Sequence, residues 1–378
     1  MNPPHPQKSR RILLAILSLS AGGAERVVSE MANWWVARGC EVAVLTFWGS
    51  EHDHYRLDPR VQRITLDFRR HSPTLRHYLG SRIRLPFRIR ETVRTFKPDA
   101  VISFIDLVNI IMVITLAGTK IPLIVSERID PRHHPISRLR SLARRLCYRY
   151  ASALVVQTGS VAGWAETVMP ASRIEVIPNF VRILPGTDDL AVHKGPEGPY
   201  ILAIGRLNRQ KGYDVLIRAF AMAKAAQAGW RLVILGEGPE RSNLERLAAD
   251  LGIGDAVLMP GIVREPAEWM RQAAFFVLPS RYEGFPNALL EAMACGCAVI
   301  AADCPSGPAE IIRHNVDGLL VPKEDVGGLS AAILKLMEDK ALRHRLGSRA
   351  VEVKNSFHEG PIMARWDALI RKAVGSDN

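Results

Sequence analysis

The strongest constraint on the fold is the alternation of short apolar runs with segments of helical periodicity along the whole chain. Parallel strands are buried on both faces and need helical crossovers, so they produce this alternation. Seven runs lie in the first half and six in the second. We therefore predict an α/β chain with one doubly wound parallel sheet in each half, with strands near residues 12–17, 41–46, 61–66, 100–104, 122–126, 153–157, 174–177, 200–204, 231–235, 256–259, 274–279, 298–301 and 318–321.

The segment 181–199 separates the two halves, because it is rich in proline, glycine and charged residues and lacks periodicity. We predict an N-terminal Rossmann-like domain over residues 1–185 and a C-terminal one over 196–355. Residues 356–378 are expected to form a final helix that packs back on the N-terminal domain. Ligands of such sheets bind at the carboxyl ends of the strands, so function is expected in the loops that follow them.

Composition excludes several other classes of protein. The chain has 378 residues, of which 48% are hydrophobic and 23% charged, as in ordinary globular proteins. Its longest apolar stretch, residues 107–118, is well short of the ~20 residues of a membrane-spanning helix, which excludes a multi-span membrane protein. Five cysteines form no disulfide framework, which favours a reduced, cytoplasmic protein. Cys295, Cys297 and Cys304 lack C-x-x-C spacing, so core packing is favoured over a metal site.

The N-terminus allows two interpretations. Lys8, Arg10 and Arg11 precede a short apolar run, as in a secretory signal. That run is followed at once by Gly22-Gly23 and a helical pattern. We therefore favour the first strand of a domain.

All of the net charge of +12 lies in residues 1–195, mostly in two arginine-rich segments, 69–94 and 132–149. In the second segment, apolar residues recur at helical spacing with arginines between them. This predicts a basic amphipathic helix, either packed on the core with a solvated basic face or lying on an anionic membrane surface. No zinc finger, helix-turn-helix spacing or aromatic stripe accompanies the arginines, so we expect no nucleic-acid partner.

Three loops after predicted strands carry residues suited to a phosphorylated ligand. Gly22-Gly23 lies between a strand and a helix, where backbone N–H groups can meet a phosphate. Arg206 and Lys211 follow the strand at 200–204 and are suited to hold a diphosphate. Neither the Gly22-Gly23 loop nor the loop Gly236-Glu-Gly238-Pro-Glu-Arg241 after the strand at 231–235 is G-x-G-x-x-G, which argues against a nicotinamide or flavin enzyme.

The third loop leads into a short helix predicted over Pro286–Cys295, with proline at its start and Gly296 after its end. Glu283 lies before this helix and Glu291 inside it. The two carboxylates are able to accept hydrogen bonds from the hydroxyls of one extended ligand.

The segment E-G-F-P-N-A-L-L-E-A-M-A-C-G at 283–296, an E-x7-E motif, follows G-R-L-N-R-Q-K-G at 205–212. With the Gly-Gly turn and the linker, these motifs resemble those of family 4 of the retaining glycosyltransferases, and the resemblance covers nearly the whole chain. It implies the GT-B fold, in which two Rossmann-like domains face each other across a cleft. It also implies a nucleotide-sugar donor and no metal or other cofactor, and we find no D-x-D motif.

Residue by residue, the resemblance implies three catalytic positions. Arg206 and Lys211 would bind the donor diphosphate and stabilise it as a leaving group. Glu283 would contact the donor sugar, and Glu291 would hold the ribose hydroxyls.

Further donor contacts follow from the same resemblance. Backbone N–H groups of Phe285 and Asn287 would help to bind the donor, and Gly22 and Gly23 would approach it from the N-terminal domain.

The loop after the strand at 122–126 departs from the family, many members of which carry a histidine there. Here Ser126-Glu127-Arg128 stands in its place. This segment, with Asp303-Cys-Pro-Ser-Gly-Pro308 and Glu310 later in the chain, is similar to sequences of a bacterial subgroup that builds surface polysaccharides and N-linked glycans on lipid carriers. The subgroup includes N-acetylgalactosamine transferases. We hypothesise that Arg128, with Glu127 beside it, meets a donor-sugar or acceptor group.

These features together predict a retaining glycosyltransferase that moves a hexose or N-acetylhexosamine from a UDP-sugar to a lipid-linked oligosaccharide. We expect it in the cytoplasm, peripheral at the inner face of the plasma membrane. A sugar-nucleotide epimerase and a phosphorylase are rivals on the same fold. A non-catalytic membrane or nucleic-acid binding module is a rival of another class, which the presence of Arg206, Lys211, Glu283 and Glu291 disfavours.

Overall fold

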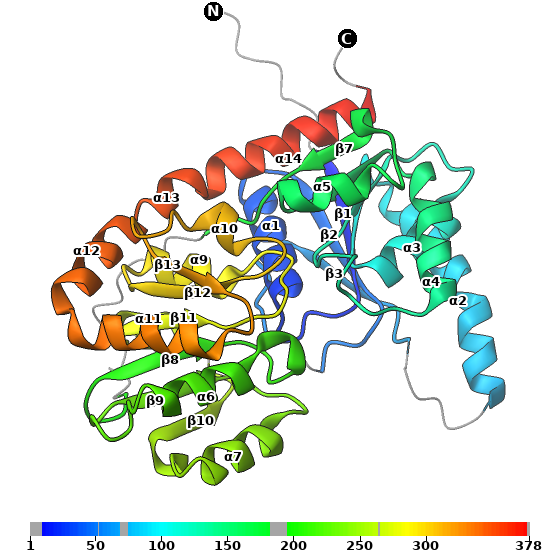
Figure 1. Cartoon of the computed structure of the whole chain (residues 1–378). Helices are drawn as coiled ribbons and strands as arrows, with labels where there is room; N and C mark the ends of the chain where they lie inside the picture. Colours follow the sequence, from blue (N-terminus) through cyan, green and yellow to red (C-terminus); the bar gives the residue numbers. More distant parts are fainter. Residues whose placement is uncertain (1–9, 52, 69–74, 182–194, 264, 376–378) are drawn as a thin grey trace, which may run out of the picture. The chain divides into compact units, whose positions relative to one another are not determined.

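The computed structural model describes residues 10–51, 53–68, 75–181, 195–263 and 265–375 (Figure 1). The chain divides into two compact units. The first contains residues 1–177 and 363–378, and the second contains residues 178–362. Each unit has its own parallel sheet and its own hydrophobic core.

The first unit contains a seven-stranded sheet in the order β3-β2-β1-β4-β5-β6-β7, and every pair of neighbours is parallel. The order reverses at β1, between β2 and β4, where doubly wound sheets bind ligands. The strands are β1 (Arg11–Ile16), β2 (Glu41–Thr46), β3 (Gln62–Thr65), β4 (Ala100–Phe104), β5 (Leu123–Ser126), β6 (Ala153–Val156) and β7 (Ile174–Val176).

The second unit contains a six-stranded parallel sheet in the order β10-β9-β8-β11-β12-β13. Its order reverses at β8, between β9 and β11. The strands are β8 (Tyr200–Ile204), β9 (Arg231–Leu235), β10 (Val257–Gly261), β11 (Phe275–Leu278), β12 (Val299–Asp303) and β13 (Leu319–Pro322). The thirteen predicted runs thus correspond to these thirteen strands, and the α/β prediction of two doubly wound sheets is confirmed.

Helices of the first unit cover its sheet, and most of them bury apolar side chains against the strands. They are α1 (Gly23–Ala37), α2 (Leu75–Phe96), α3 (Asp106–Leu116), α4 (Arg138–Cys147) and α5 (Gly159–Ala165), with 3-10 turns η1 (Tyr148–Tyr150) and η2 (Ala171–Arg173). No helix of the described chain is both long and apolar enough to cross a membrane.

Helices of the second unit include α9 (Asn287–Ala294), which packs on β11 and β12. It begins and ends within one residue of the prediction. The others are α6 (Tyr213–Met222), α7 (Arg241–Asp250), α8 (Pro266–Gln272), α10 (Pro308–Ile311), α11 (Val326–Glu338), α12 (Lys340–Ala350) and α13 (Val353–Ser356), with turns η3 (Arg209–Lys211) and η4 (Gly254–Ala256).

The last helix, α14 (Glu359–Val374), contains the division between the units. Its residues from Met363 onward belong to the first unit, where Trp366 is buried near Phe104. Asp367 accepts a hydrogen bond from the Trp35 indole at 2.9 Å, and α14 lies beside β7 in Figure 1.

The first unit ends earlier than the predicted boundary at residue 185. Val181 already belongs to the second unit because its backbone N–H donates to the Phe357 carbonyl at 2.9 Å and its side chain joins that unit's core. Most of the predicted linker, residues 182–194, lies outside the described residues. So do the signal-like residues 1–9 and the side chains of residues 69–83 in the first arginine-rich segment.

Helix α4 corrects the expectation that a core-facing helix would present a solvated basic face. Arg144 is buried, whereas Leu139 and Leu142 are 77% and 53% exposed. The reversal has a physical cause: the inward arginines meet buried carboxylates, Arg140 with Asp106 and Arg144 with Glu127. The apolar residues of this helix therefore face outward.

Candidate active site

Three loops of the second unit meet at the carboxyl ends of β8, β11 and β12. The backbone N–H of Arg281 donates to the Gln210 carbonyl at 2.8 Å, and the Gln210 side chain donates to the Tyr282 carbonyl at 3.0 Å. Arg281 also makes a two-point ion pair with Asp214, both contacts at 2.8 Å. The backbone N–H of Glu283 donates to the Pro305 carbonyl at 3.3 Å. These bonds fix the loop of Lys211 against the loop of Glu283.

The centre of this cluster is an ion pair between Lys211 and Glu283. The Lys211 Nζ lies 2.6 Å from Glu283 Oε1, and the Ser280 hydroxyl donates to the same oxygen at 2.6 Å. The Glu283 side chain is 5% exposed and that of Lys211 is 19% exposed. Burial makes this pair electrostatically strong, because little water screens it.

The loop that contains Lys211 depends on two glycines. Gly205 directly follows β8 with φ +155°, and Gly212, directly after Lys211, is left-handed with φ +67°. A Cβ on Gly212 would lie 2.1 Å from the Pro279 carbonyl oxygen, so only glycine lets these two loops approach so closely.

Tyr213, which the sequence analysis did not single out, adds a buried hydroxyl to the cluster. Its Oη has no hydrogen-bond partner among the described residues. Burial, and next the negative charge of Glu283, raise the pKa of the Tyr213 phenol well above its usual range, so it stays a donor. In the sequence, the one indication that Tyr213 belongs to the site was its position directly after Lys211-Gly212.

Replacing Tyr213 with phenylalanine is expected to leave the free energy of unfolding unchanged or to raise it, because the hydroxyl makes no bond that is lost. Tyr200 is the matched control: it is also buried, but its hydroxyl donates to the Trp269 carbonyl at 2.7 Å. Tyr200→Phe should cost about 1 kcal/mol. Urea unfolding measures both, and an equal loss in the two variants would contradict the unpaired state of Tyr213.

The remaining predicted residues of this unit lie nearby with different exposure. Arg206 is exposed on the loop after β8, and no partner for its side chain occurs in the described part of the chain. Glu291 is half-buried, one turn into α9. Phe285 is buried against Phe357, with ring centroids 5.6 Å apart. The backbone N–H of Asn287 donates to the Phe285 carbonyl at 3.0 Å, and the donor contact expected of it stays a prediction.

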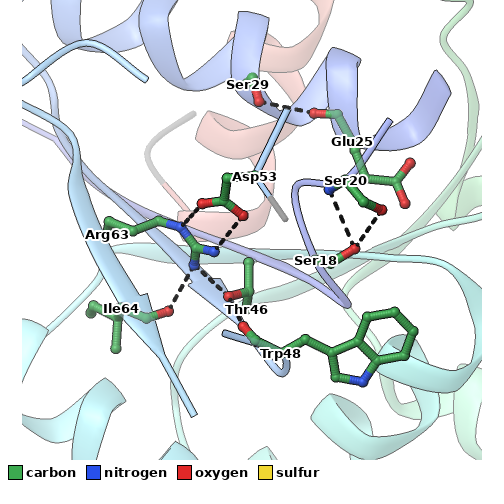
Figure 2. Close-up of polar contacts among 9 residues, drawn as sticks. All are labelled: Ser18, Ser20, Glu25, Ser29, Thr46, Trp48, Asp53, Arg63 and Ile64. Atoms are coloured by element: carbon green, nitrogen blue, oxygen red, sulfur yellow. Dashed lines mark hydrogen bonds and ion pairs between the residues drawn. The ribbon is translucent and has the colours of Figure 1, made fainter. Parts of the chain in front are cut away.

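At the carboxyl edge of the first sheet, Gly22 caps α1 with an extended backbone and Gly23 is its exposed first residue. Beside them, the Ser18 and Ser20 hydroxyls lie 3.0 Å apart (Figure 2). The approach of these glycines to a donor in the other unit stays a prediction.

Figure 2 also shows residues that the sequence analysis missed, after β2 and on β3. Arg63 pairs with Asp53 at 3.0 Å and donates to Thr46, whose hydroxyl donates to the Trp48 carbonyl at 2.7 Å. The Trp48 side chain is half-buried. In the sequence, the indication that Trp48 could belong to a site was its position directly after the strand predicted at 41–46.

Glu127 is turned into the first unit. Its carboxylate is 2% exposed, accepts a 2.6 Å hydrogen bond from the Tyr148 hydroxyl and lies 3.7 Å from Arg144 Nη1. Burial raises the pKa of the Glu127 carboxyl to about 7, although the positive charge of Arg144 opposes that shift. These contacts make Glu127 a residue that positions its loop, and they argue against the predicted contact with a sugar or acceptor.

Arg128, the next residue, is half-buried at the same edge. Its Nη1 donates weakly to the Ser126 hydroxyl at 3.4 Å, and its guanidinium lies 5.5 Å from the Phe104 ring centre. Burial lowers the pKa of Arg128 to about 9, and the negative charge of Glu25 at the start of α1 opposes this shift. The loop after β5 is therefore close enough to the start of α1 for the charges of Arg128 and Glu25 to interact.

Among the described residues no group of three or more His, Cys, Asp or Glu side chains is placed to hold a metal ion. That a reaction here needs no metal stays a prediction. The five cysteines form no disulfide, and burial raises the pKa of the Cys297 and Cys304 thiols.

Comparison with known families decides the class of protein. Residues 22–179 match the family described as "Glycosyl transferase 4-like domain", and residues 189–353 match "Glycosyl transferases group 1". Both models describe glycosyl transferases and together span most of the chain, so this chain is a glycosyltransferase. The enzyme class and the resemblance to family 4 are thereby confirmed.

Two relatives of this glycosyltransferase differ in how much they share with it. The Campylobacter jejuni GalNAc-alpha-(1->4)-GalNAc-alpha-(1->3)-diNAcBac-PP-undecaprenol alpha-1,4-N-acetyl-D-galactosaminyltransferase is 29% identical over 95% of this chain and 98% of its own. The Streptomyces coelicolor exopolysaccharide phosphotransferase SCO2592 is 39% identical over 59% of this chain but only 23% of its own length. The chain therefore spans about a quarter of that second relative.

Among solved structures, Anabaena Alr3699/HepE in complex with UDP superposes with a TM-score of 0.77. The match covers 96% of this chain and 100% of HepE at 19% identity. This likeness supports the GT-B fold, with two Rossmann-like domains.

Proposed function

We propose that this glycosyltransferase is a retaining enzyme that moves a hexose or N-acetylhexosamine from a UDP-sugar to a lipid-linked oligosaccharide in surface glycan biosynthesis. The observation that carries the proposal is the buried Lys211–Glu283 pair, 2.6 Å apart, in which Lys211 lies on the same loop as the exposed Arg206. A diphosphate suits the two cations, and sugar hydroxyls suit the carboxylate.

In the proposed step the acceptor hydroxyl attacks the anomeric carbon from the side that the diphosphate leaves. The bond between that carbon and the β-phosphate oxygen breaks, the new glycosidic bond forms, and the acceptor proton passes to the leaving phosphate. Arg206 and Lys211 stabilise the charge that develops on the phosphate, and no metal or cofactor takes part. Glu283 and the Tyr213 hydroxyl bind the sugar, and Glu291 binds the ribose.

We infer the identity of the nucleotide and the class of acceptor from similar proteins, and the place of the acceptor from residues of the first unit. HepE binds UDP, and the Campylobacter relative is named for a glycan carried on undecaprenol diphosphate. We place the acceptor glycan at the carboxyl edge of the first sheet, where Trp48 follows β2 and Arg128 follows β5. An acceptor of this kind is held in a membrane, so we propose that the enzyme works at the anionic cytoplasmic surface.

A calorimetric titration with UDP and a panel of UDP-sugars tests the donor site. The native chain should bind UDP saturably, and both Lys211→Ala and Glu291→Ala should weaken binding by at least about tenfold, the effect of losing a charge-assisted hydrogen bond. Lys340→Ala, an exposed lysine of the same unit, is the control and should bind as the native chain does.

Three outcomes oppose the proposal. Absence of nucleotide binding in the native chain would favour the binding-module alternative. Conversion of one UDP-sugar into its epimer without an acceptor would favour the epimerase. Product with inverted anomeric configuration would rule out the retaining step.

A further inference from the structure

Helix α4 exposes a row of apolar side chains on the surface of the first unit. Leu139, Leu142 and Leu146 are 77%, 53% and 48% exposed, and Tyr150, just after the helix, is 76% exposed. The three leucines are spaced i, i+3 and i+7, so they share one face of the helix. Burying them in an apolar phase would be favourable, and no residue of the described chain buries them.

A groove of about 660 Å³ borders this row and carries positive charge. Its lining contains three cations, Arg145, Arg149 and Arg173, against one acid, Glu166, and its apolar part comprises Leu142, Leu146, Val168, Met169 and Pro170. Arg173 is anchored, because its Nη1 donates to the Ala151 carbonyl at 3.0 Å. Arg145 and Arg149 are exposed and have no hydrogen-bond partner among the described residues.

We propose that this surface, defined as the α4 leucine row and the adjoining arginine groove, docks on an anionic phospholipid bilayer. The groove holds a lipid phosphate headgroup, and Leu139 and Leu142 enter the interfacial region. Charge complementarity selects this occupant: two unpaired arginines suit a phosphate, and leucines beside them suit acyl chains. The inference rests on the proposed function in one respect, that the acceptor lies in a membrane.

The opposite face of α4 connects this surface to the predicted acceptor edge. Arg140 Nη2 donates to Asp106 at 2.6 Å, directly after β4, and Arg144 lies 3.7 Å from Glu127, directly after β5. Both acids are buried, so these pairs hold α4 at a fixed place on the unit. Docking through the outer face therefore orients the carboxyl edge of β4 and β5 with respect to the bilayer.

Sedimentation of the full chain with vesicles tests the surface. Phosphatidylcholine vesicles with phosphatidylglycerol should bind the native chain, and vesicles of phosphatidylcholine alone should bind it weakly. Arg145→Glu/Arg149→Glu should lower the partition coefficient at least ~20-fold, since each basic residue near an anionic surface contributes roughly fivefold. Leu139→Ser/Leu142→Ser should lower it about tenfold through lost apolar contact.

Matched controls separate this surface from general charge and hydrophobicity. Arg218→Glu/Arg246→Glu reverses two exposed arginines of the second unit, and Met222→Ser/Ile262→Ser removes two of its exposed apolar side chains. Both controls should sediment as the native chain does. UDP titration of every variant shows whether the second unit remains folded.

Equal sedimentation of the native chain and both α4 variants would overturn the proposal. So would loss of binding in the arginine variant alone, because leucine insertion would then be absent. Release by inorganic phosphate, but not by sodium chloride of equal ionic strength, would assign the groove to a free phosphate. Absent UDP binding with normal vesicle binding would refute the donor site and leave the docking surface standing.

Discussion

Replacing Lys211 with methionine is expected to lower kcat/KM for the donor by about 100-fold to 1000-fold, the usual effect of removing one group that stabilises developing charge. Methionine keeps the length and packing of the side chain but removes the ammonium. In the resting enzyme that ammonium lies 2.6 Å from Glu283. A bound diphosphate offers it a second anionic partner, so its loss affects the leaving group directly.

Loss of activity must be separated from loss of stability, because Lys211→Met leaves the buried Glu283 carboxylate with Ser280 as its remaining hydrogen-bond donor. A buried charge without its partner destabilises a protein by about 3–5 kcal/mol. The double variant Lys211→Met/Glu283→Gln removes both charges. We expect it to recover most of the unfolding free energy and none of the activity.

Steady-state kinetics with the donor identified by titration, together with urea unfolding, measure both quantities. Lys340→Met, which removes an exposed lysine of the same unit, should change neither. If the double variant were as active as the native enzyme, the role of Lys211 at the diphosphate would be wrong.

The strands were predictable because each is a short apolar run buried on both faces, which leaves a local signal. Strands β2, β4, β8 and β9 have the predicted bounds, and the others shift by one or two residues at their ends. The boundary between the units was not predictable to the same precision. It depends on the Val181–Phe357 hydrogen bond, which joins residues far apart in the sequence.

The donor cluster was partly predictable. Arg206, Lys211, Glu283 and Glu291 lie in motifs with fixed local spacing, and the structure brings Lys211 into contact with Glu283. Tyr213 could not be selected, because tyrosines at helix starts are common and only burial without a partner makes its hydroxyl unusual. The Arg63–Asp53 pair after β2 likewise depends on which polar side chains meet across the sheet edge.

Of the two interpretations of α4, the one in which it packs its leucines on the core was wrong for a physical reason. Periodicity places the leucines on one face of the helix and Arg140 and Arg144 on the opposite face, but it does not show which face is buried. Hydrophobicity would bury the leucines. Asp106 and Glu127 reverse this orientation of α4, because they are buried carboxylates on other segments and need cationic partners.

This interpretation predicts that Arg144→Met destabilises the enzyme by about 3 kcal/mol at pH 8 and by about 1 kcal/mol at pH 5, because the cost of an unpaired buried carboxylate depends on its charge. Arg144 is 3% exposed, lies 3.7 Å from Glu127 and stacks over Trp164 at 4.8 Å. Methionine retains much of the contact with Trp164 while removing the charge.

The sign of the pH dependence follows from Glu127. Its pKa is raised to about 7 from an ordinary 4.5, so its protonated form stabilises the native state below about pH 4.5. That contribution is lost as pH rises through 7. The positive charge of Arg144 holds the pKa of Glu127 down. Removing Arg144 therefore raises that pKa further and increases the loss of folding stability above pH 7. At pH 5 the carboxyl is largely neutral with or without Arg144.

Urea unfolding at pH 5 and pH 8 of Arg144→Met, Glu127→Gln and the double variant measures this coupling. The double variant should recover most of the stability lost at pH 8, because no buried carboxylate then lacks its partner. Arg145→Met is the matched control: it changes the next residue, which is exposed, and should leave stability unchanged at both pH values. An equal loss at pH 5 and pH 8 in Arg144→Met would mean that packing against Trp164, rather than pairing with Glu127, buries this arginine and turns the leucines of α4 outward.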